Sequence, residues 1–214
     1  MDNIIITIQR QFGSGGKTIG EDLARELGIP CYGRNILRMA SDDSGINEAL
    51  FNEADEKIQS GKLFGISKHI YDGQLIPPGR DHFVSTENLF YYQAKIMKEL
   101  AEKESCVIIG RCAGFVLRDN PNAISVFVHA NKQFCLDRAG ERVALTGKEL
   151  ERYVEEIDKY RGNFHRYYTG LEWDDAKNYD LSIDSGKVGF EKTGEIIKEY
   201  VKIRFGRLPY AGER

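Results

Sequence analysis

The sequence predicts an α/β fold built on a doubly wound parallel sheet. Its first apolar run, Ile4–Ile8, is rich in β-branched residues and stops abruptly before a glycine cluster. Two further continuous apolar runs, Cys106–Ile109 and Ala123–Val128, are typical of strands buried on both faces of a parallel sheet. Strand and helix patterns alternate five times along the chain, which is the order that such a sheet requires.

Length and composition indicate one globular domain. The chain has 214 residues, 41% of them hydrophobic, and no apolar run approaches membrane-spanning length. The first strand begins at once, without a basic region or a signal-like apolar stretch, so we expect a cytoplasmic protein with no membrane partner. Four cysteines without C-x-x-C spacing indicate reduced thiols rather than disulfides or a zinc site. A net charge of −3 and a pI near 5.9 argue against a nucleic-acid partner.

The first half of the chain is predicted to form a strand, a helix, a short strand, two more helices and an irregular stretch. The first helix carries an apolar stripe at helical spacing and a glycine stop signal, at Ile19, Leu23, Leu27 and Gly28. The next elements are expected at 29–32 (strand), 35–40 (helix), 41–45 (break) and 46–60 (polar helix). Glycines and prolines then interrupt residues 61–81, and we expect this stretch to belong to a small lobe over a cleft.

The second half is predicted to contain four helices and three strands. The helices are expected at about 85–103, 131–145, 146–168 and 191–205. The strands are expected at 106–109, 123–128 and 179–184, with a turn at 185–186. Asn131 suits a helix N-cap, and Thr146 with Glu149 has the spacing of a capping box.

The segment between the first strand and the first helix is the strongest functional signal. A glycine loop that opens a helix presents backbone N–H groups and the positive end of the helix dipole to an anion. Gly16, Lys17 and Thr18 match the second half of the phosphate-loop pattern G-x-x-x-x-G-K-[ST], whereas Gln11 replaces its first glycine. The alternatives are a plain surface loop or a dinucleotide fingerprint, which lacks its third glycine here. We predict a phosphate site at Gly13, Ser14, Gly15, Gly16, Lys17 and Thr18, with Lys17 on phosphate oxygens and Thr18 on Mg²⁺.

Arginines supply the second signal. Ligands of such sheets lie beyond the carboxyl ends of the strands, and Arg111 directly follows a buried strand. Its planar guanidinium suits a phosphate, although pairing with a carboxylate is the alternative. The segment from 137 to 166 is rich in both signs of charge, so a solvated helix with internal ion pairs competes with a functional lid. The candidates for neutralising a migrating phosphoryl group are Arg138, Arg142 and Arg161.

Aromatic and imidazole side chains are interpreted mainly as packing. The cluster near the end of the arginine-rich segment has helical spacing, and its members are Tyr160, Phe164, Tyr167, Tyr168 and Trp173. His165, inside this cluster, is predicted to be structural. His69 and His82 receive no assignment. No Ser-His-Asp order suggests acyl transfer, and no carboxylate pair suggests glycoside hydrolysis.

Three stretches carry a resemblance to a known family. They are ITIQRQFGSGGKTIGEDLARELG at the start, CVIIGRCAGFVL in the middle and YDLSIDSG near the end, with support from Ile157–Trp173. The chain resembles the cytidylate kinase-like family, within the nucleoside monophosphate kinase group of phosphate-loop enzymes. The resemblance covers nearly the whole chain and implies one P-loop kinase-like domain over 1–214 with a five-stranded parallel core. It further implies a small helical acceptor-binding lobe at 33–84 and a helical lid at 137–170.

The resemblance also implies a reaction. ATP would donate its γ-phosphoryl group, with Mg²⁺, to CMP, dCMP or a related small phosphate acceptor. Arg34 or Arg38, together with Gln93 and Arg111, would face the acceptor, and the three lid arginines would close over both substrates. The oligomeric state is left open between monomer and homodimer.

Two departures from the family pattern bear on substrate and metal. Bacterial cytidylate kinases resemble one another in an Asp-Gly-Arg-Asp-Ile-Gly stretch, which reads Ile-Gly-Arg-Cys-Ala-Gly at 109–114 here. Arg111 is kept but both acidic residues are absent, so cytidine specificity is open. Mg²⁺ also lacks the carboxylate expected after the third strand, and Asp184 or waters are the substitutes. Two other functions stay open: an ATP- or ADP-binding regulatory module, and a kinase for a non-nucleotide metabolite.

Overall fold

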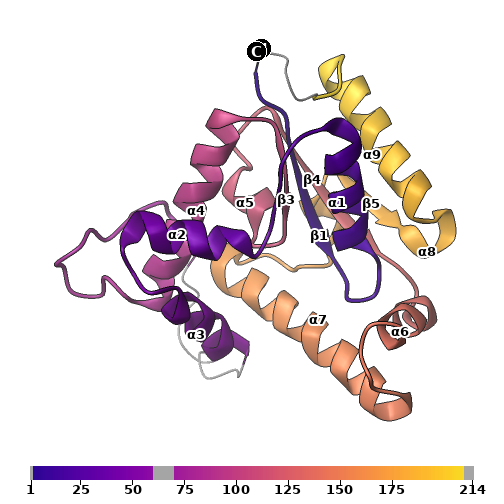
Figure 1. The fold of residues 1–214 in the computed structure, drawn as a ribbon, viewed down its shortest axis with the longest axis horizontal. Coiled ribbons are helices and arrows are strands. Elements are labelled where there is room, and N and C mark those ends of the chain that lie inside the picture. Colours follow the sequence, from indigo (N-terminus) through magenta and orange to yellow (C-terminus); the bar gives the residue numbers. More distant parts are fainter. Residues whose placement is uncertain (1, 60–69, 210–214) are drawn as a thin grey trace.

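A central, all-parallel sheet of five strands organises the chain in the computed structural model, which describes residues 2–59 and 70–209 (Figure 1). The strand order is β2-β3-β1-β4-β5. The strands are β1 (Ile5–Arg10), β2 (Cys31–Tyr32), β3 (Cys106–Ile109), β4 (Ala123–His129) and β5 (Leu181–Asp184). The helices are α1 (Gly16–Leu27), α2 (Asn35–Ser44), α3 (Glu48–Gln59), α4 (Thr86–Lys103), α5 (Ala113–Val116), α6 (Lys132–Gly140), α7 (Gly147–Thr169), α8 (Ser185–Val188) and α9 (Phe190–Phe205), with a 3₁₀ turn at Ala176–Asn178. The predicted doubly wound parallel sheet is confirmed.

β1 lies at the centre of the sheet and explains the apolar run at the N-terminus. It pairs with β3 on one side and β4 on the other, so Ile5 lies opposite both Cys106 and Ala123. Because successive side chains point to opposite faces of a strand, Ile5 enters one hydrophobic core and Ile6 enters the other. Both faces are therefore apolar, which removes the alternation that a half-exposed strand would show.

Helices cover both faces and cross the end of the sheet (Figure 1). α1 and α9 cover one face, where Leu23 and Ile197 are buried in the same core. α4 and the second half of α7 cover the other, where the Phe90 and Tyr168 rings stack with centroids 3.9 Å apart. The first half of α7, with α6, lies beyond the carboxyl ends of the strands. Of the predicted aromatic cluster, Phe164, Tyr167 and Tyr168 are buried in this core, Tyr160 packs against it and Trp173 is buried apart from it.

Several element boundaries and one predicted cap differ from the prediction. α2 continues through the expected break to Ser44, whose Oγ donates to the Ala40 carbonyl, and the left-handed Gly45 ends it. α6 ends at Gly140, short of residue 145, because Val143 and Leu145 turn inward to pack against α7. α7 begins at Gly147, but the Thr146 side chain makes no capping bond, so the predicted capping box is wrong.

One expected turn is a helix in the structure, and part of the expected irregular stretch lies outside the described residues. The turn expected at 185–186 is instead the short helix α8. Residues 61–69, including His69, lie outside the described residues. No helix within 2–59 or 70–209 combines the length and apolarity needed to cross a bilayer.

Candidate active site

The loop between β1 and α1 has the backbone geometry of an anion site. Gly13 and Gly15 have φ angles of 83° and 80°, a left-handed conformation that glycine adopts without strain. α1 begins at Gly16 without a side-chain cap. The first amides of the helix, at Gly16, Lys17 and Thr18, therefore have no intrahelical acceptor and remain available to a phosphate.

Side chains around this donor loop, residues 11–18, fix its shape. Ser14 Oγ lies 2.9 Å from the Gln11 carbonyl and 3.0 Å from the Val128 carbonyl, and Ser185 Oγ donates to the Ser14 carbonyl at 2.6 Å. Gln11 Oε1 accepts from the Ala130 amide at 3.2 Å. The residue that replaces the first glycine of the phosphate-loop pattern thus ties the loop to the segment after β4.

Two glycines of the donor loop are required by close neighbours. A Cβ on Gly13 would lie 2.8 Å from Cys135 Cα and would overlap the Cys135 carbonyl, which belongs to α6. A Cβ on Gly15 would lie 2.7 Å from Cε2 of the Phe190 ring, at the start of α9. Any larger residue at either position would push the loop away from the helices that support it.

The predicted donor-site side chains lie at the surface of this loop. Lys17 Nζ is 3.5 Å from Glu21 Oε1, and the Lys17 side chain is 65% exposed, so a donor phosphate must compete with a solvated ion pair. Thr18 Oγ1 accepts from Arg142 Nη2 at 2.9 Å. The structure thus brings Arg142 of the predicted lid onto the donor loop. Arg138 instead pairs with Glu141 at 2.5 Å and lies over the Phe190 ring.

The residues present offer Mg²⁺ one clear ligand. Thr18 Oγ1 has a second lone pair beyond the one that meets Arg142. Asp184, the predicted substitute, has one oxygen engaged, because its Oδ1 accepts from the Gly186 and Lys187 amides at the start of α8, while its Oδ2 lies 3.6 Å from Lys187 Nζ. In residues 2–59 and 70–209 no three His, Cys, Asp or Glu side chains form a metal-binding group. This donor set fits a Mg²⁺ ion that is carried in by nucleotide phosphates and meets a single hydroxyl.

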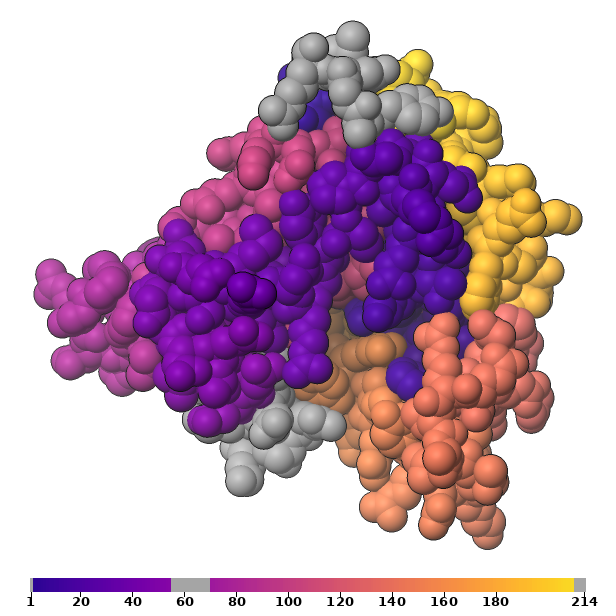
Figure 2. Space-filling view, viewed as in Figure 1, coloured from indigo at the N-terminus to yellow at the C-terminus, as the bar shows by residue number. Residues whose placement is uncertain are grey.

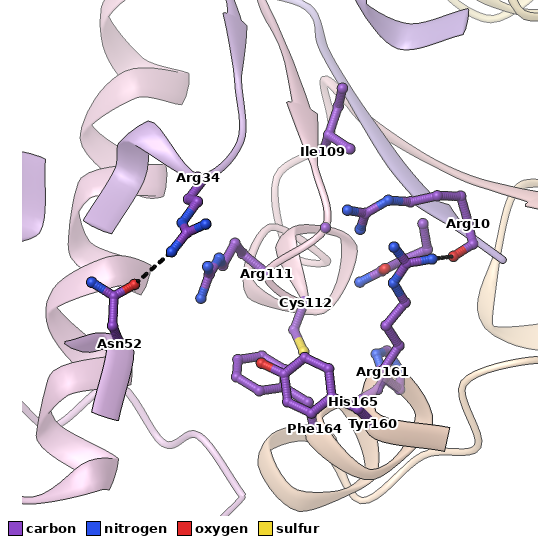
Figure 3. Close-up of a pocket in the computed structure, with 12 residues that line it drawn as sticks. Arg10, Arg34, Asn52, Ile109, Arg111, Cys112, Tyr160, Arg161, Phe164 and His165 are labelled. Atoms are coloured by element: carbon purple, nitrogen blue, oxygen red, sulfur yellow. Dashed lines mark hydrogen bonds between the residues drawn. The ribbon is translucent and has the colours of Figure 1, made fainter. Parts of the chain in front are cut away.

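A cavity of about 400 Å³ opens beside the donor loop, between the N-terminus of α2, α3, the end of β3 and α7. Figure 2 shows the corresponding hollow between the α2–α3 side and the α6–α7 side of the molecule. Its charged lining residues are four arginines, Arg10, Arg34, Arg111 and Arg161 (Figure 3). The other lining residues are neutral or aromatic: Gln9, Asn52, Ile109, Gly110, Cys112, Tyr160, Phe164 and His165. Among the described lining residues there is no carboxylate.

The predicted acceptor residues differ in whether they line the cavity. Arg34 lines the cavity and donates to Asn52 Oδ1 at 3.2 Å, whereas Arg38 is exposed on α2 and does not line it. Arg111 has a left-handed φ of 56° in the turn after β3. Gln93 is buried on α4 and accepts from Arg111 Nη1 at 3.4 Å, so it supports Arg111 from outside the cavity lining.

Arg10 is a cavity residue that the sequence reasoning missed. It is the last residue of β1, and Arg161 Nη1 donates to its carbonyl at 3.0 Å. Asp158 completes this junction, because its Oδ1 accepts from the Phe12 amide at 2.7 Å and lies 3.4 Å from Arg161 Nη1. The strand-end rule that singled out Arg111 applies equally to Arg10 and was the signal available for finding it.

Burial shifts the pKa values of four groups at this junction. Desolvation, and then repulsion from Arg161 and Arg111, lowers the pKa of Arg10 to about 9. Desolvation also lowers the pKa of Arg161. Burial outweighs the Phe12 amide and the two guanidinium groups and raises the pKa of Asp158 to about 6. It lowers the pKa of His165 to about 4, so this imidazole is neutral near pH 7, and neither ring nitrogen has a partner among the described residues.

Comparison with known proteins identifies the family of this chain. The model of the cytidylate kinase-like family matches residues 5–187, which include the donor loop and the arginine-lined cavity. The chain belongs to the cytidylate kinase-like family. Among curated proteins, none matches the chain.

Solved structures agree with this family membership at the level of the fold. An uncharacterized protein from Eubacterium ventriosum ATCC 27560 is 27% identical, with a TM-score of 0.69 over 94% of this chain and 99% of its own. A shikimate kinase from Bacteroides thetaiotaomicron is 16% identical, with a TM-score of 0.52 over 93% and 98%. A sugar kinase from Janibacter sp. HTCC2649 is 16% identical, with a TM-score of 0.51 over 94% and 95%. Family and fold together indicate a P-loop phosphotransferase.

Proposed function

We propose that the chain transfers the γ-phosphoryl group of ATP, with Mg²⁺, to a small acceptor that carries a phosphate, with CMP and dCMP as the leading candidates. The observation that carries the proposal is the junction at the end of β1. Residue 10 belongs to the arginine-lined cavity, and the donor loop begins at residue 11. An anionic acceptor in the cavity would therefore lie beside the phosphates of a nucleotide in the loop.

The chemistry of the cavity favours a phosphate acceptor over a hydroxyl acceptor. A hydroxyl nucleophile gains from a general base, and the described lining residues include no carboxylate. His165 is neutral near pH 7, but its pKa of about 4 makes it a weak base. A phosphate monoester needs no base, because it is doubly ionised above its second pKa of about 6. Its oxygen would form a bond to the γ-phosphorus while the bond to the β–γ bridging oxygen breaks and ADP leaves.

The residues of the chain would act by position and charge. Lys17 would leave its ion pair with Glu21 and contact the donor phosphates. The Gly16, Lys17 and Thr18 amides would bind the same phosphates. Arg142 lies within reach, because it already contacts Thr18. Mg²⁺, with Thr18 Oγ1 as its ligand from the chain, supplies further neutralisation of phosphate charge. Arg34, Arg111 and Arg161 would hold the acceptor anion.

Lys17 offers the direct test of the donor site. We expect K17A to lower turnover by about 100-fold or more, the scale seen when one charge-stabilising group is removed from a transition state. Its fold should be unchanged, because the side chain is exposed. ADP release would be measured with ATP and a panel of CMP, dCMP, UMP, AMP, GMP, shikimate and gluconate. Unchanged turnover in K17A, or turnover with hydroxyl acceptors alone, would contradict the proposal.

A regulatory ATP- or ADP-binding module is the second candidate. It is favoured by the Lys17–Glu21 ion pair, which leaves the lysine turned to the surface, and by the absence of the family's two acidic residues at 109 and 112. Tight ATP binding by calorimetry without ADP release in the presence of any acceptor would support this module. Acceptor-dependent release would exclude it.

A further inference from the structure

The inner end of the cavity, where Arg10 and Arg161 meet, carries strong positive charge. Arg10 Nε is buried and has no hydrogen-bond partner among the described residues. Asp158 favours the charged form of Arg10, but its Oδ1 already accepts from the Phe12 amide and also faces Arg161. Buried guanidinium groups are costly unless they are balanced, so this end of the cavity is arranged for an anion that arrives with a ligand.

The fold makes a specific place for the Arg10 side chain. Gly110 has a φ of 80°, and a Cβ at this position would lie 2.5 Å from Arg10 Nη1. The guanidinium therefore rests against the bare backbone of the turn that follows β3. In Figure 3, the Arg10 and Arg161 side chains approach each other from β1 and α7, whereas the Arg111 side chain extends toward Arg34.

The Arg10 side chain is not required to hold α7 against the sheet. The bond between these elements runs from Arg161 Nη1 to the main-chain carbonyl of residue 10, at 3.0 Å. Any residue at position 10 supplies that carbonyl. The Arg10 guanidinium takes no part in that bond, and it lines the cavity.

We propose that the Arg10 and Arg161 side chains together bind the phosphate group of the acceptor at the point where the donor loop leaves β1. This assignment rests on the proposed function and adds Arg10 to its binding residues. A phosphate matches the site because guanidinium groups donate paired N–H bonds to phosphate oxygens and because two cations suit a dianion. It would also place an ionised oxygen next to the residue that begins the donor loop.

Phosphate binding can be measured apart from turnover. Wild-type protein would be saturated with Mg²⁺ and a non-hydrolysable ATP analogue, which fills the donor loop, and titrated with inorganic phosphate by calorimetry. We expect R10M to bind phosphate at least tenfold more weakly, because it keeps the side-chain length but loses a charged donor. R152M is the matched control, since Arg152 lies on α7, is 82% exposed and pairs with Glu156. Its phosphate affinity should equal that of wild type.

Stability and conservative variants separate binding from structure. R10M should resist urea at least as well as wild type, because a buried charge is removed. R10K keeps a charge and should bind phosphate with intermediate affinity, and it replaces R10M if that variant does not fold. Equal phosphate affinity in R10M and wild type would overturn the proposal. Equally tight, Arg10-dependent binding of succinate would overturn the assignment to phosphate.

Kinetics distinguish this inference from the proposed function. If both hold, R10M should raise the acceptor KM by tenfold or more and leave the ATP KM unchanged. Arg10-dependent phosphate binding without transfer from ATP to any acceptor would support the phosphate subsite and contradict the proposed kinase activity. Transfer from ATP with the same acceptor KM in R10M and wild type would support the proposed kinase activity and contradict the phosphate subsite.

Discussion

At His165, burial has a measurable consequence for acid stability. Desolvation lowers its pKa in the folded chain to about 4, against an ordinary value of 6.5. Below pH 6.5 the unfolded chain takes up a proton that the folded chain refuses, so the free energy of unfolding falls as the pH drops toward 4. The slope that this group can contribute is at most about 1.4 kcal/mol per pH unit.

Comparison with H165F isolates this effect. Urea unfolding of both proteins at several values between pH 4 and pH 7 should show wild type losing stability relative to H165F as the pH falls. Asp158, whose raised pKa acts in the opposite direction, is present in both proteins and cancels in the difference. Parallel pH profiles for the two proteins would show that His165 ionises as freely in the fold as in the unfolded chain.

Single residues also show where prediction from sequence ends. The donor-loop residues were found because glycines, lysine and threonine at this fixed spacing, between a strand and a helix, are typical of phosphate loops. Arg34 and Arg38 could not be separated, because residues four apart share a helix face and the choice depends on which end of α2 meets the cavity. Arg10 was missed although it ends β1 and the strand-end rule that identified Arg111 applies to it as well. The role of Gln11 depends on the Ala130 amide, which is distant in sequence.

At the scale of elements, two helix N-termini that look alike in sequence should respond differently to alanine. Ser85 Oγ accepts from the Asn88 amide at 3.2 Å at the start of α4, whereas the Thr146 side chain makes no capping bond at the start of α7. We expect S85A to lower the free energy of unfolding by about 1 kcal/mol. T146A should change it by less than about 0.5 kcal/mol, as for an ordinary surface substitution. Urea denaturation measures both, and equal losses would contradict the assignment of the caps.

Element boundaries were predictable only where a local signal decided them. α4 begins and ends close to the expected residues, because Ser85 is a strong N-cap and an apolar strand follows. The end of α6 was not predictable, because it depends on Val143 and Leu145 packing against Leu150 of the next helix. That contact is tertiary, and helical periodicity alone continues past Gly140.

At the scale of the whole molecule, donor binding should stabilise the fold. A ligand that binds only the folded chain raises the free energy of unfolding by about 2.7 kcal/mol at 100 times its Kd. We expect Mg²⁺ and ATP to produce a rise of this kind in the urea unfolding of wild-type protein and a much smaller one in K17A at the same concentrations. R152M is again the control, because it changes an exposed charge on α7 without touching the donor loop. Equal stabilisation of K17A and wild type would place ATP elsewhere.

The architecture as a whole was more predictable than its site. Continuous apolar runs identify strands with two covered faces, and their alternation with helices leaves few topologies open. The cavity, in contrast, is built from β1, the residue before α2, α3, the turn after β3 and α7, which meet only after folding. No local pattern reports that four arginines from these elements line one space.

The hydrogen bond from the Phe12 amide to Asp158 marks the point at which α7 changes its packing partners. Beyond this bond the helix is anchored, since Phe164 and Tyr168 are buried in the core that covers the sheet. Before it, α7 packs against α6 through a small apolar cluster, and Tyr153 lies edge-on to the Phe12 ring. Any swing toward a bound nucleotide would therefore pivot near Asp158. Arg138 and Arg142 would travel with the moving arm, while Arg161 would stay in place beside the arginine-lined cavity.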